Sequence, residues 1–122
     1  MSKRRLPLGE ETLPITIVEG KMTSLQDLEQ HYPLLYKDLV SRKVFELKVS
    51  DELLVSRVKQ RHAQGRVATI YRMVHDGVKE FSPEEQIEEM EARTPTGLDF
   101  IKAESKLLEE ELKVLCENYA SS

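Results

Sequence analysis

The sequence has one cysteine and no long apolar run, and each of these absences excludes a class of protein. A single cysteine, Cys116, excludes an intrachain disulfide, and its helical spacing from Leu112 predicts a buried thiol in a reducing compartment. No apolar stretch approaches the roughly 18 residues of a membrane-spanning helix, and the basic start is not followed by the apolar segment of a secretion signal. We therefore expect a cytoplasmic protein that does not contact a membrane.

The sequence also lacks the motifs of common catalytic and metal sites. His31, His62 and His75 are scattered, without the paired spacing or the additional cysteines of a zinc site. There is no glycine-rich phosphate loop and no nucleophile elbow. The sequence therefore predicts no catalytic residue, no metal, no cofactor and no small-molecule substrate, so we expect a protein that is not an enzyme.

The composition indicates elongated amphipathic helices. Of the 122 residues, 39% are hydrophobic and 33% are charged, which differs from about 45–50% and about 25% in an average globular domain. The length suits one domain. Residues 1–14 have proline and glycine among charges and no periodicity, so they are predicted to form a flexible arm, and residues 15–122 a single mainly helical domain.

Local signals place the elements of this domain. Strands are predicted at 15–18 and 44–49, which would form a short two-stranded β-ribbon near the N-terminus. Helices are predicted, each from a capping residue, a proline or helical apolar spacing, at 24–32, 33–41, from Ser50 to about Gly65, 67–78, 82–93 and about 96–117. The fold class predicted is mainly α, a small helical domain with a long C-terminal amphipathic helix.

The last predicted helix carries a leucine seam. Its apolar residues recur at alternating spacings of three and four, which is typical of a coiled coil or a helical hairpin. The seam residues that we predict to pack against a partner helix, in the same chain or in another copy, are Leu98, Ile101, Leu108, Leu112 and Leu115.

Charge is strongly polarised along the chain. Residues 54–79 hold six basic residues against one acid, a net charge of +5, whereas residues 80–122 hold twelve acids against four bases, a net charge of −8. The residues predicted to bind an anionic partner are Arg57, Arg61, Arg66, Thr69 and Arg72. That partner is nucleic acid, another protein or the acidic C-terminal segment, and the sequence leaves these alternatives open.

One string within the basic segment supports the nucleic-acid alternative. Residues 67–77, VATIYRMVHDG, resemble the recognition-helix segment of small helix-turn-helix DNA-binding proteins, in which a Thr-Ile-Tyr-Arg run precedes an apolar residue and a glycine. The resemblance implies a helix in the major groove, with Thr69 and Arg72 near phosphates or base edges and Arg66 near the backbone. An ordinary amphipathic helix with a solvated basic face and a protein-docking face are the competing interpretations.

Two hypotheses for function follow. The first is a non-enzymatic protein–protein interaction role, in which an adaptor, assembly factor or regulator acts through the leucine seam and the central basic face, by binding a protein or by self-association. It explains both halves of the charge polarity, since complementary faces select partners. The alternative is a helix-turn-helix-like DNA-binding transcriptional regulator that dimerises through its C-terminal helix.

Overall fold

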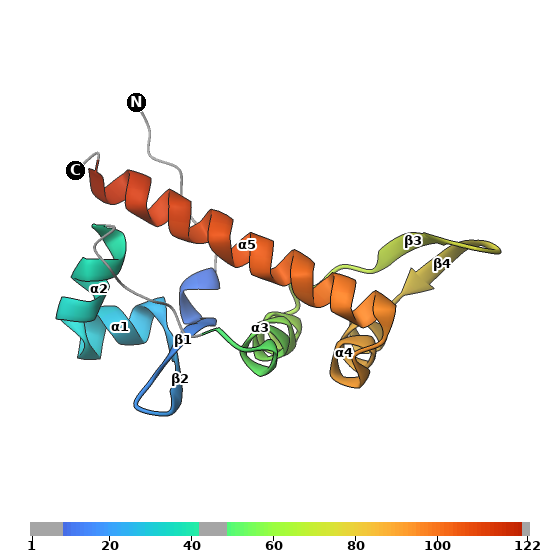
Figure 1. Cartoon of the computed structure of the whole chain (residues 1–122), viewed down its shortest axis with the longest axis horizontal. Helices are drawn as coiled ribbons and strands as arrows, with labels where there is room; N and C mark the ends of the chain where they lie inside the picture. Colours follow the sequence, from blue (N-terminus) through green and yellow to red (C-terminus); the bar gives the residue numbers. More distant parts are fainter. Residues whose placement is uncertain (1–8, 42–48, 121–122) are drawn as a thin grey trace.

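The computed structural model describes residues 9–41 and 49–120, which form a mainly helical fold with two small antiparallel ribbons (Figure 1). The predicted fold class is confirmed, including the long C-terminal helix and the ribbon near the N-terminus. The elements in chain order are η1 (Glu10–Thr12), β1 (Pro14–Val18), β2 (Lys21–Ser24), α1 (Leu25–His31), α2 (Pro33–Val40), α3 (Asp51–Ala63), β3 (Ile70–Val74), β4 (Gly77–Phe81), α4 (Pro83–Ala92) and α5 (Pro95–Ala120).

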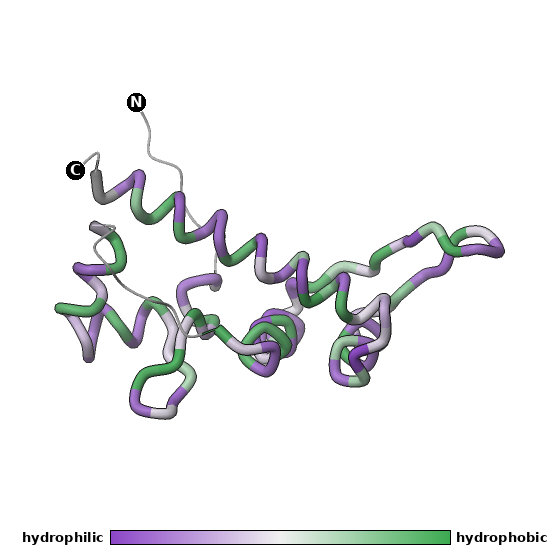
Figure 2. The backbone as a smooth tube through the Cα atoms, viewed as in Figure 1, coloured by the Kyte–Doolittle hydropathy of each residue, from purple (hydrophilic) through white to green (hydrophobic). Residues whose placement is uncertain are grey.

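The long helix α5 organises the other elements. In Figure 1 it runs along one side of the molecule, with α2 near its C-terminal end, α3 near its middle and α4 near its N-terminal end, and all three contact it. Figure 2 shows apolar and polar residues alternating along α5, as expected for a helix with one buried face. The buried apolar core is formed by Ile15, Leu25, Leu28, Leu39, Leu54, Val55, Val58, Met90, Ile101 and Leu108.

The predicted helix starts are confirmed by their caps. The hydroxyl of Ser24 accepts from the amide of Asp27, and the hydroxyl of Ser82 accepts from the amide of Glu85, in two complete capping boxes. Ser50 caps α3 through its hydroxyl alone, which accepts from the amide of Leu53. Such caps satisfy amides that the first helical turn leaves without an internal acceptor, so short polar side chains determine where these helices begin.

Helix α5 begins slightly earlier than predicted, because Thr94 rather than Thr96 caps it. The hydroxyl of Thr94 accepts from the amide of Gly97 at 3.0 Å. Gly97 also allows α4 and α5 to pack closely, since a Cβ atom added to it would lie 1.8 Å from the carbonyl oxygen of Glu89. Any other residue at position 97 would force the two helices apart.

The N-terminal ribbon pairs β1 with β2 rather than with the predicted strand at 44–49. Ile17 lies opposite Met22 and Val18 opposite Lys21 in this antiparallel pair. Residues 44–48 lie outside the described residues. The folded part also extends into the predicted arm of residues 1–14, because η1 precedes the ribbon and Glu10 is buried. Residues 1–8 lie outside the described part of the chain.

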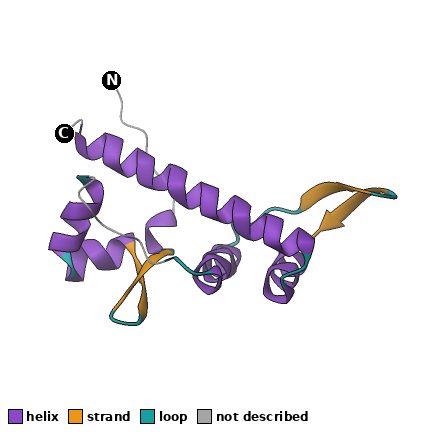
Figure 3. Ribbon diagram, viewed as in Figure 1, coloured by secondary structure: helices purple, strands orange, loops and turns teal. Residues whose placement is uncertain are grey.

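The prediction of a helix over residues 67–78 is wrong. Strands β3 and β4 form an antiparallel hairpin in which Val74 lies opposite Gly77 and Ile70 opposite Phe81, and this hairpin projects beyond the N-terminal end of α5 (Figures 1 and 3). The segment is rich in β-branched and aromatic residues, which favour strands. The two-residue turn His75–Asp76 is followed by Gly77, whose φ is +127, and the helical spacing of Ile70 and Val74 concealed this turn signal.

Helix α3 ends at a glycine, which separates it from the hairpin. Gly65 has φ +70 and donates its amide to the carbonyl of His62 at 2.9 Å. The amide of Arg66 donates to the carbonyl of Arg61 at 3.0 Å, which completes a Schellman motif. The predicted break near Gly65 is therefore confirmed, although the chain continues as a strand instead of a second helix.

Candidate functional site

The basic segment predicted to bind an anionic partner is divided between two regions of the structure. Arg57 and Arg61 lie on α3, Arg72 lies on β3, and Arg66 and Thr69 lie in the connection between them. Helix α3 contacts the middle of α5, whereas the hairpin extends past the N-terminal end of α5 (Figure 1). The two regions therefore have different neighbours.

Arg57 is completely buried and joins three elements. Its Nε donates to Oε2 of Glu104 and its Nη2 to Oε2 of Glu111, both at 2.9 Å, so α3 is ion-paired with α5. Its Nη1 donates to the carbonyl of Pro14 at 2.9 Å, which attaches the start of β1. A buried guanidinium is tolerated only when its charge and its hydrogen bonds are matched, and here both conditions are met.

Arg61 and Arg66 extend this arrangement to the N-terminal turn η1. Arg61 donates to Oε1 of Glu10 at 2.9 Å and to Oε1 of Glu104 at 2.7 Å, and Arg66 donates to Oε1 of Glu10 at 3.0 Å. The three arginines and three glutamates are called the buried ion cluster below, and its members are Glu10, Arg57, Arg61, Arg66, Glu104 and Glu111. Its formal charge is zero when every member is ionised.

The two glutamates at one end of the cluster are unequal acids. Burial by itself would raise the pKa of Glu10, but hydrogen bonds from Arg61 and Arg66, together with the neighbouring Glu111 carboxyl when it carries a proton, lower it to about 2. Burial and the neighbouring carboxyl of Glu10 raise the pKa of Glu111 to about 7, against the opposing charge of Arg57. The pair therefore holds one proton on Glu111 across the acidic range.

The cluster places the predicted anion-binding residues differently from the expectation. Arg57 is 0% exposed and Arg61 is 11% exposed, and both are paired with carboxylates of α5 and η1. Of the three partners left open by the sequence, the acidic C-terminal segment is the one that these two arginines contact. Arg72 is paired with Asp99 at the start of α5, and Thr69 is exposed.

The leucine seam is largely covered by its own chain. Ile101 and Leu108 are buried in the core, and Leu112 and Leu115 pack at its edge. Leu98 is 47% exposed. Most of the seam therefore packs against other elements of the same chain. The binding of a second chain by these residues stays a prediction.

One side of the hairpin is attached to the helices. Because side chains alternate across a strand, Ile70, Arg72, Lys79 and Phe81 share this inner face. Phe81 is buried and its ring meets that of Phe100 edge to face, with centroids 5.4 Å apart. The Arg72 ion pair with Asp99 adds a second attachment to α5.

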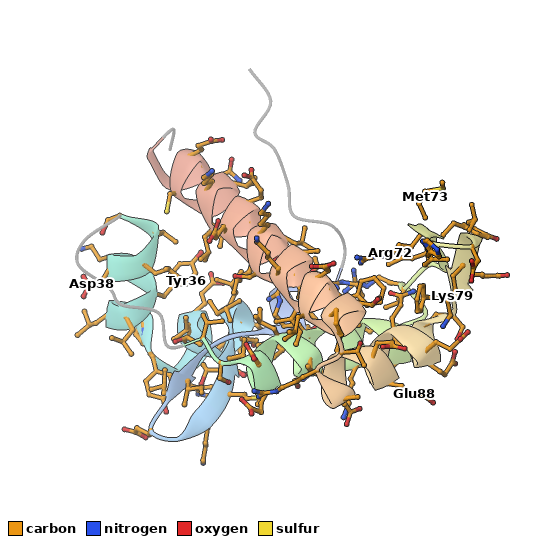
Figure 4. All side chains as sticks on the ribbon, turned by 45° about the vertical axis from the view of Figure 1, so that its right-hand side comes forward. Tyr36, Asp38, Arg72, Met73, Lys79 and Glu88 are labelled. Atoms are coloured by element: carbon orange, nitrogen blue, oxygen red, sulfur yellow. The ribbon has the colours of Figure 1, made fainter. Side chains whose placement is uncertain are left out.

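The other side of the hairpin, called the outer face below, consists of Tyr71, Met73, Val78 and Glu80. Tyr71 is 69% exposed, Met73 77% and Val78 63%. Figure 4 shows Met73 pointing away from the helices, and Figure 2 shows apolar residues extending along the hairpin toward its tip. A cluster of three exposed apolar side chains on a projecting element is typical of an interaction surface.

The helix-turn-helix geometry is not formed by the segment that resembled it. A recognition helix requires residues 67–76 to be helical, and Ile70–Val74 is a strand in the described structure. The physical reason is that the Schellman motif at Gly65 ends α3 and is followed by a strand-forming sequence with a turn at His75 and Asp76.

The described residues line a mainly apolar groove whose charged side chains are paired within the chain. A groove of about 310 Å³ opens between α3, α4, α5 and the base of β3, with a largely apolar lining that includes Ile70, Phe100 and Leu107. Arg61 and Arg66 also line it, and their guanidinium groups are engaged by Glu10, Glu104 and Gln64. Within residues 9–41 and 49–120, no three His, Cys, Asp or Glu side chains are placed to hold a metal ion.

Comparisons with protein-family models, curated proteins and solved structures found no match to this chain. None of the helices in the described ranges is both long enough and apolar enough to cross a bilayer.

Two sets of residues were missed by the sequence analysis. Glu104 follows Ile101 by three residues, and Glu111 follows Leu108 by three residues, so both lie on the buried face of α5. This helical spacing was a signal in the sequence that they face the core. Glu10 gave no such signal, because it lies in a segment without periodicity. The outer face of the hairpin was missed because the segment was predicted as a helix, and the alternation of side chains along a strand was not considered.

Proposed function

We propose that this protein is a non-enzymatic binding protein that docks another polypeptide on the β3–β4 hairpin. The observation that carries the proposal is the outer face, where Tyr71, Met73 and Val78 expose more than 60% of their surface on the side turned away from the helices. The proposal keeps the interaction role expected from the sequence. It moves the binding element from the leucine seam and the basic face to the hairpin, since the core covers most of the seam and carboxylates engage Arg57 and Arg61.

The hairpin suits an extended polypeptide better than a compact ligand. It is a sheet of only two strands, so within the described residues both outer edges carry backbone groups that no third strand meets. A two-stranded ribbon is marginally stable alone, and an added strand both pairs an edge and extends the apolar face. The attachments through Phe81 and Arg72 hold the hairpin in place for such a partner.

Charge on the inner face specifies the partner further. Arg72 and Lys79 lie directly opposite each other, and like charges at such positions repel. Asp99 neutralises Arg72, whereas the ammonium of Lys79 lies over the Phe81 ring, 4.9 Å from its centroid, and has no carboxylate partner among the described ion pairs. A partner strand beside β4 therefore fits best with an acidic residue opposite Lys79 and an apolar residue opposite Val78.

The experiment compares two equally exposed apolar residues. Met73 on the outer face and Leu34 on α2 are each 77% exposed, so Met73→Asp and Leu34→Asp add the same charge at sites of equal solvent exposure. A photoreactive residue at Tyr71 would identify the bound polypeptide in cells, and calorimetry with the purified partner would then measure affinity. We expect Met73→Asp to weaken binding at least tenfold, about 1.4 kcal/mol, and Leu34→Asp to change it less than twofold.

Two results would overturn the proposal. Equal loss of affinity in both variants would show that the outer face is not the binding element. Cross-linking of Tyr71 to nucleic acid alone, with no polypeptide bound, would assign the hairpin to a different class of partner. If sedimentation of the pure protein reveals a dimer that Met73→Asp dissociates, the docked polypeptide is a second copy of this chain.

A further inference from the structure

The buried ion cluster contains one polar atom whose partner is missing unless a proton is added. Glu111 is 4% exposed, and its Oε2 accepts from Arg57 at 2.9 Å. Its Oε1 is the one buried side-chain oxygen or nitrogen in the described residues that has no hydrogen-bond partner. A buried carboxylate oxygen without a donor is costly, whereas a protonated oxygen becomes a donor itself.

The groups around Glu111 identify the acceptor. On α3 its partner is Nη2 of Arg57, which lies 2.9 Å from Glu111 and 3.5 Å from Glu10 of η1, so the buried carboxylate of Glu10 lies beside that of Glu111. The strand β1 contributes the Pro14 carbonyl, which is bonded to Arg57. The remaining charged members of the cluster are Arg61, Arg66 and Glu104, and the titratable groups Glu11, Glu29 and Tyr36 line a separate cleft beside Leu115, one turn further along α5.

We propose that a single proton held between Glu111 and Glu10 fastens the N-terminal turn η1 to α3 and α5, so that the cluster acts as a proton-sensitive clasp. With the proton present, Oε1 of Glu111 donates to Glu10, and three arginine cations face two carboxylate anions. When the proton is lost, Oε1 of Glu111 has no donor, and two buried carboxylates share Nη2 of Arg57, which lies 3.5 Å from Glu10 and 2.9 Å from Glu111. Their repulsion weakens the hold on Glu10, which is the contact of η1 with the cluster.

The sign of the pH effect follows from the two protonation equilibria. The pKa of Glu111 is raised to about 7 in the closed structure, from 4.5 when the group is solvated. In the closed form η1 is attached to the cluster, and in the open form it is released. Between these two pKa values the closed form keeps a proton that the open form has lost, so a rise in pH favours the open form. The opening constant therefore increases by up to about two orders of magnitude as pH rises from about 4.5 to above 7, and then levels off.

The opening would be local and would start at η1. The amide of Thr12 donates to the carbonyl of Gly9 at 3.2 Å, and the amide of Leu13 donates to that of Glu10 at 3.1 Å. Both hydrogen bonds belong to the turn that Glu10 anchors, so both amides report on the clasp. Arg66 lies in the connection from α3 to β3, but no residue of the hairpin itself belongs to the cluster. This inference therefore does not rest on the proposed function.

Amide hydrogen exchange of the full chain, measured by NMR between pH 5 and pH 8.5 and corrected for the intrinsic rate, tests the clasp. We expect the opening constants of Thr12 and Leu13 to rise at least tenfold over this range. Glu111→Gln retains a neutral side chain that accepts from Arg57 and donates to Glu10, so its opening constants should stay constant. The control is Glu110→Gln, which removes an exposed carboxylate paired with Lys113 and should behave as the wild type.

A carboxyl-carbon titration of Glu111 in the wild-type protein gives a second measurement that needs no variant. We expect a midpoint near 7. A midpoint below 5, or opening constants of Thr12 and Leu13 that stay constant with pH in the wild type, would overturn the clasp. A pH response in Glu111→Gln equal to that of the wild type would also overturn it.

Discussion

Replacing Arg57 by methionine should be among the most damaging single changes in this protein. The substitution roughly keeps the apolar length of the side chain but removes three hydrogen bonds of 2.9 Å. It leaves the Pro14 carbonyl without its donor and Glu111 without its cation, while Glu104 keeps Arg61. Removing one partner of a buried ion pair costs about 3–5 kcal/mol, against a total stability of about 5–15 kcal/mol for a domain.

Urea denaturation followed by circular dichroism measures this cost, and two comparisons isolate its cause. At pH 5.5 Glu111 already carries its proton in the wild type, so Arg57→Met should cost less than at pH 8. At pH 8 the variant must either bury a carboxylate without its cation or take up a proton on folding, and both cost stability. The double variant Arg57→Met with Glu111→Met removes both charges and should recover most of the lost stability. A cost below about 1 kcal/mol, or a double variant no more stable than Arg57→Met, would refute the reasoning that buried charge balance holds α3 to α5.

Three further changes test other parts of the fold by urea denaturation. Phe81→Ala should cost about 3–5 kcal/mol and release the hairpin, because Phe81 is buried against Phe100; a cost below about 1 kcal/mol would contradict that attachment. Gly97→Ala should cost at least about 1–3 kcal/mol, since its Cβ would overlap the Glu89 carbonyl, and an unchanged midpoint would contradict the close helix contact. Ser82→Ala should cost about 1 kcal/mol through loss of the α4 cap, and no change would contradict the capping box.

The parts of the fold that local chemistry determines were predictable from the sequence. Ser24, Ser50 and Ser82 mark helix starts because a hydroxyl at that position satisfies amides of the next turn, whatever the rest of the chain does. Pro33 begins α2 for an equally local reason, since its missing N–H costs nothing in the first turn. Such signals require no knowledge of distant residues.

The candidate sites depended on distant residues and were largely missed. Arg57 meets Glu111 across 54 positions of sequence and Arg61 meets Glu10 across 51, so no local pattern places them together. The hairpin was not predicted for a different reason. The spacing of Ile70 and Val74 fits a helix, whereas their β-branched side chains and the turn before Gly77 favour strands. These two local signals conflict, and the contact of Phe81 with Phe100, which lies far away in the sequence, is consistent with the strand.

The four arginines of the basic segment are paired inside the protein with acids of α5 and η1, and this pairing is the central claim. The side-chain Nε–H signals of Arg57 and Arg61 in a nitrogen-15 NMR spectrum, recorded with and without duplex DNA, test it most directly. We expect both signals to persist at pH 8, to exchange slowly with water, and to remain unshifted when DNA is added, because their donors are already bonded to Glu104 and Glu10. Rapid exchange of both signals, or a shift on addition of DNA, would contradict the claim.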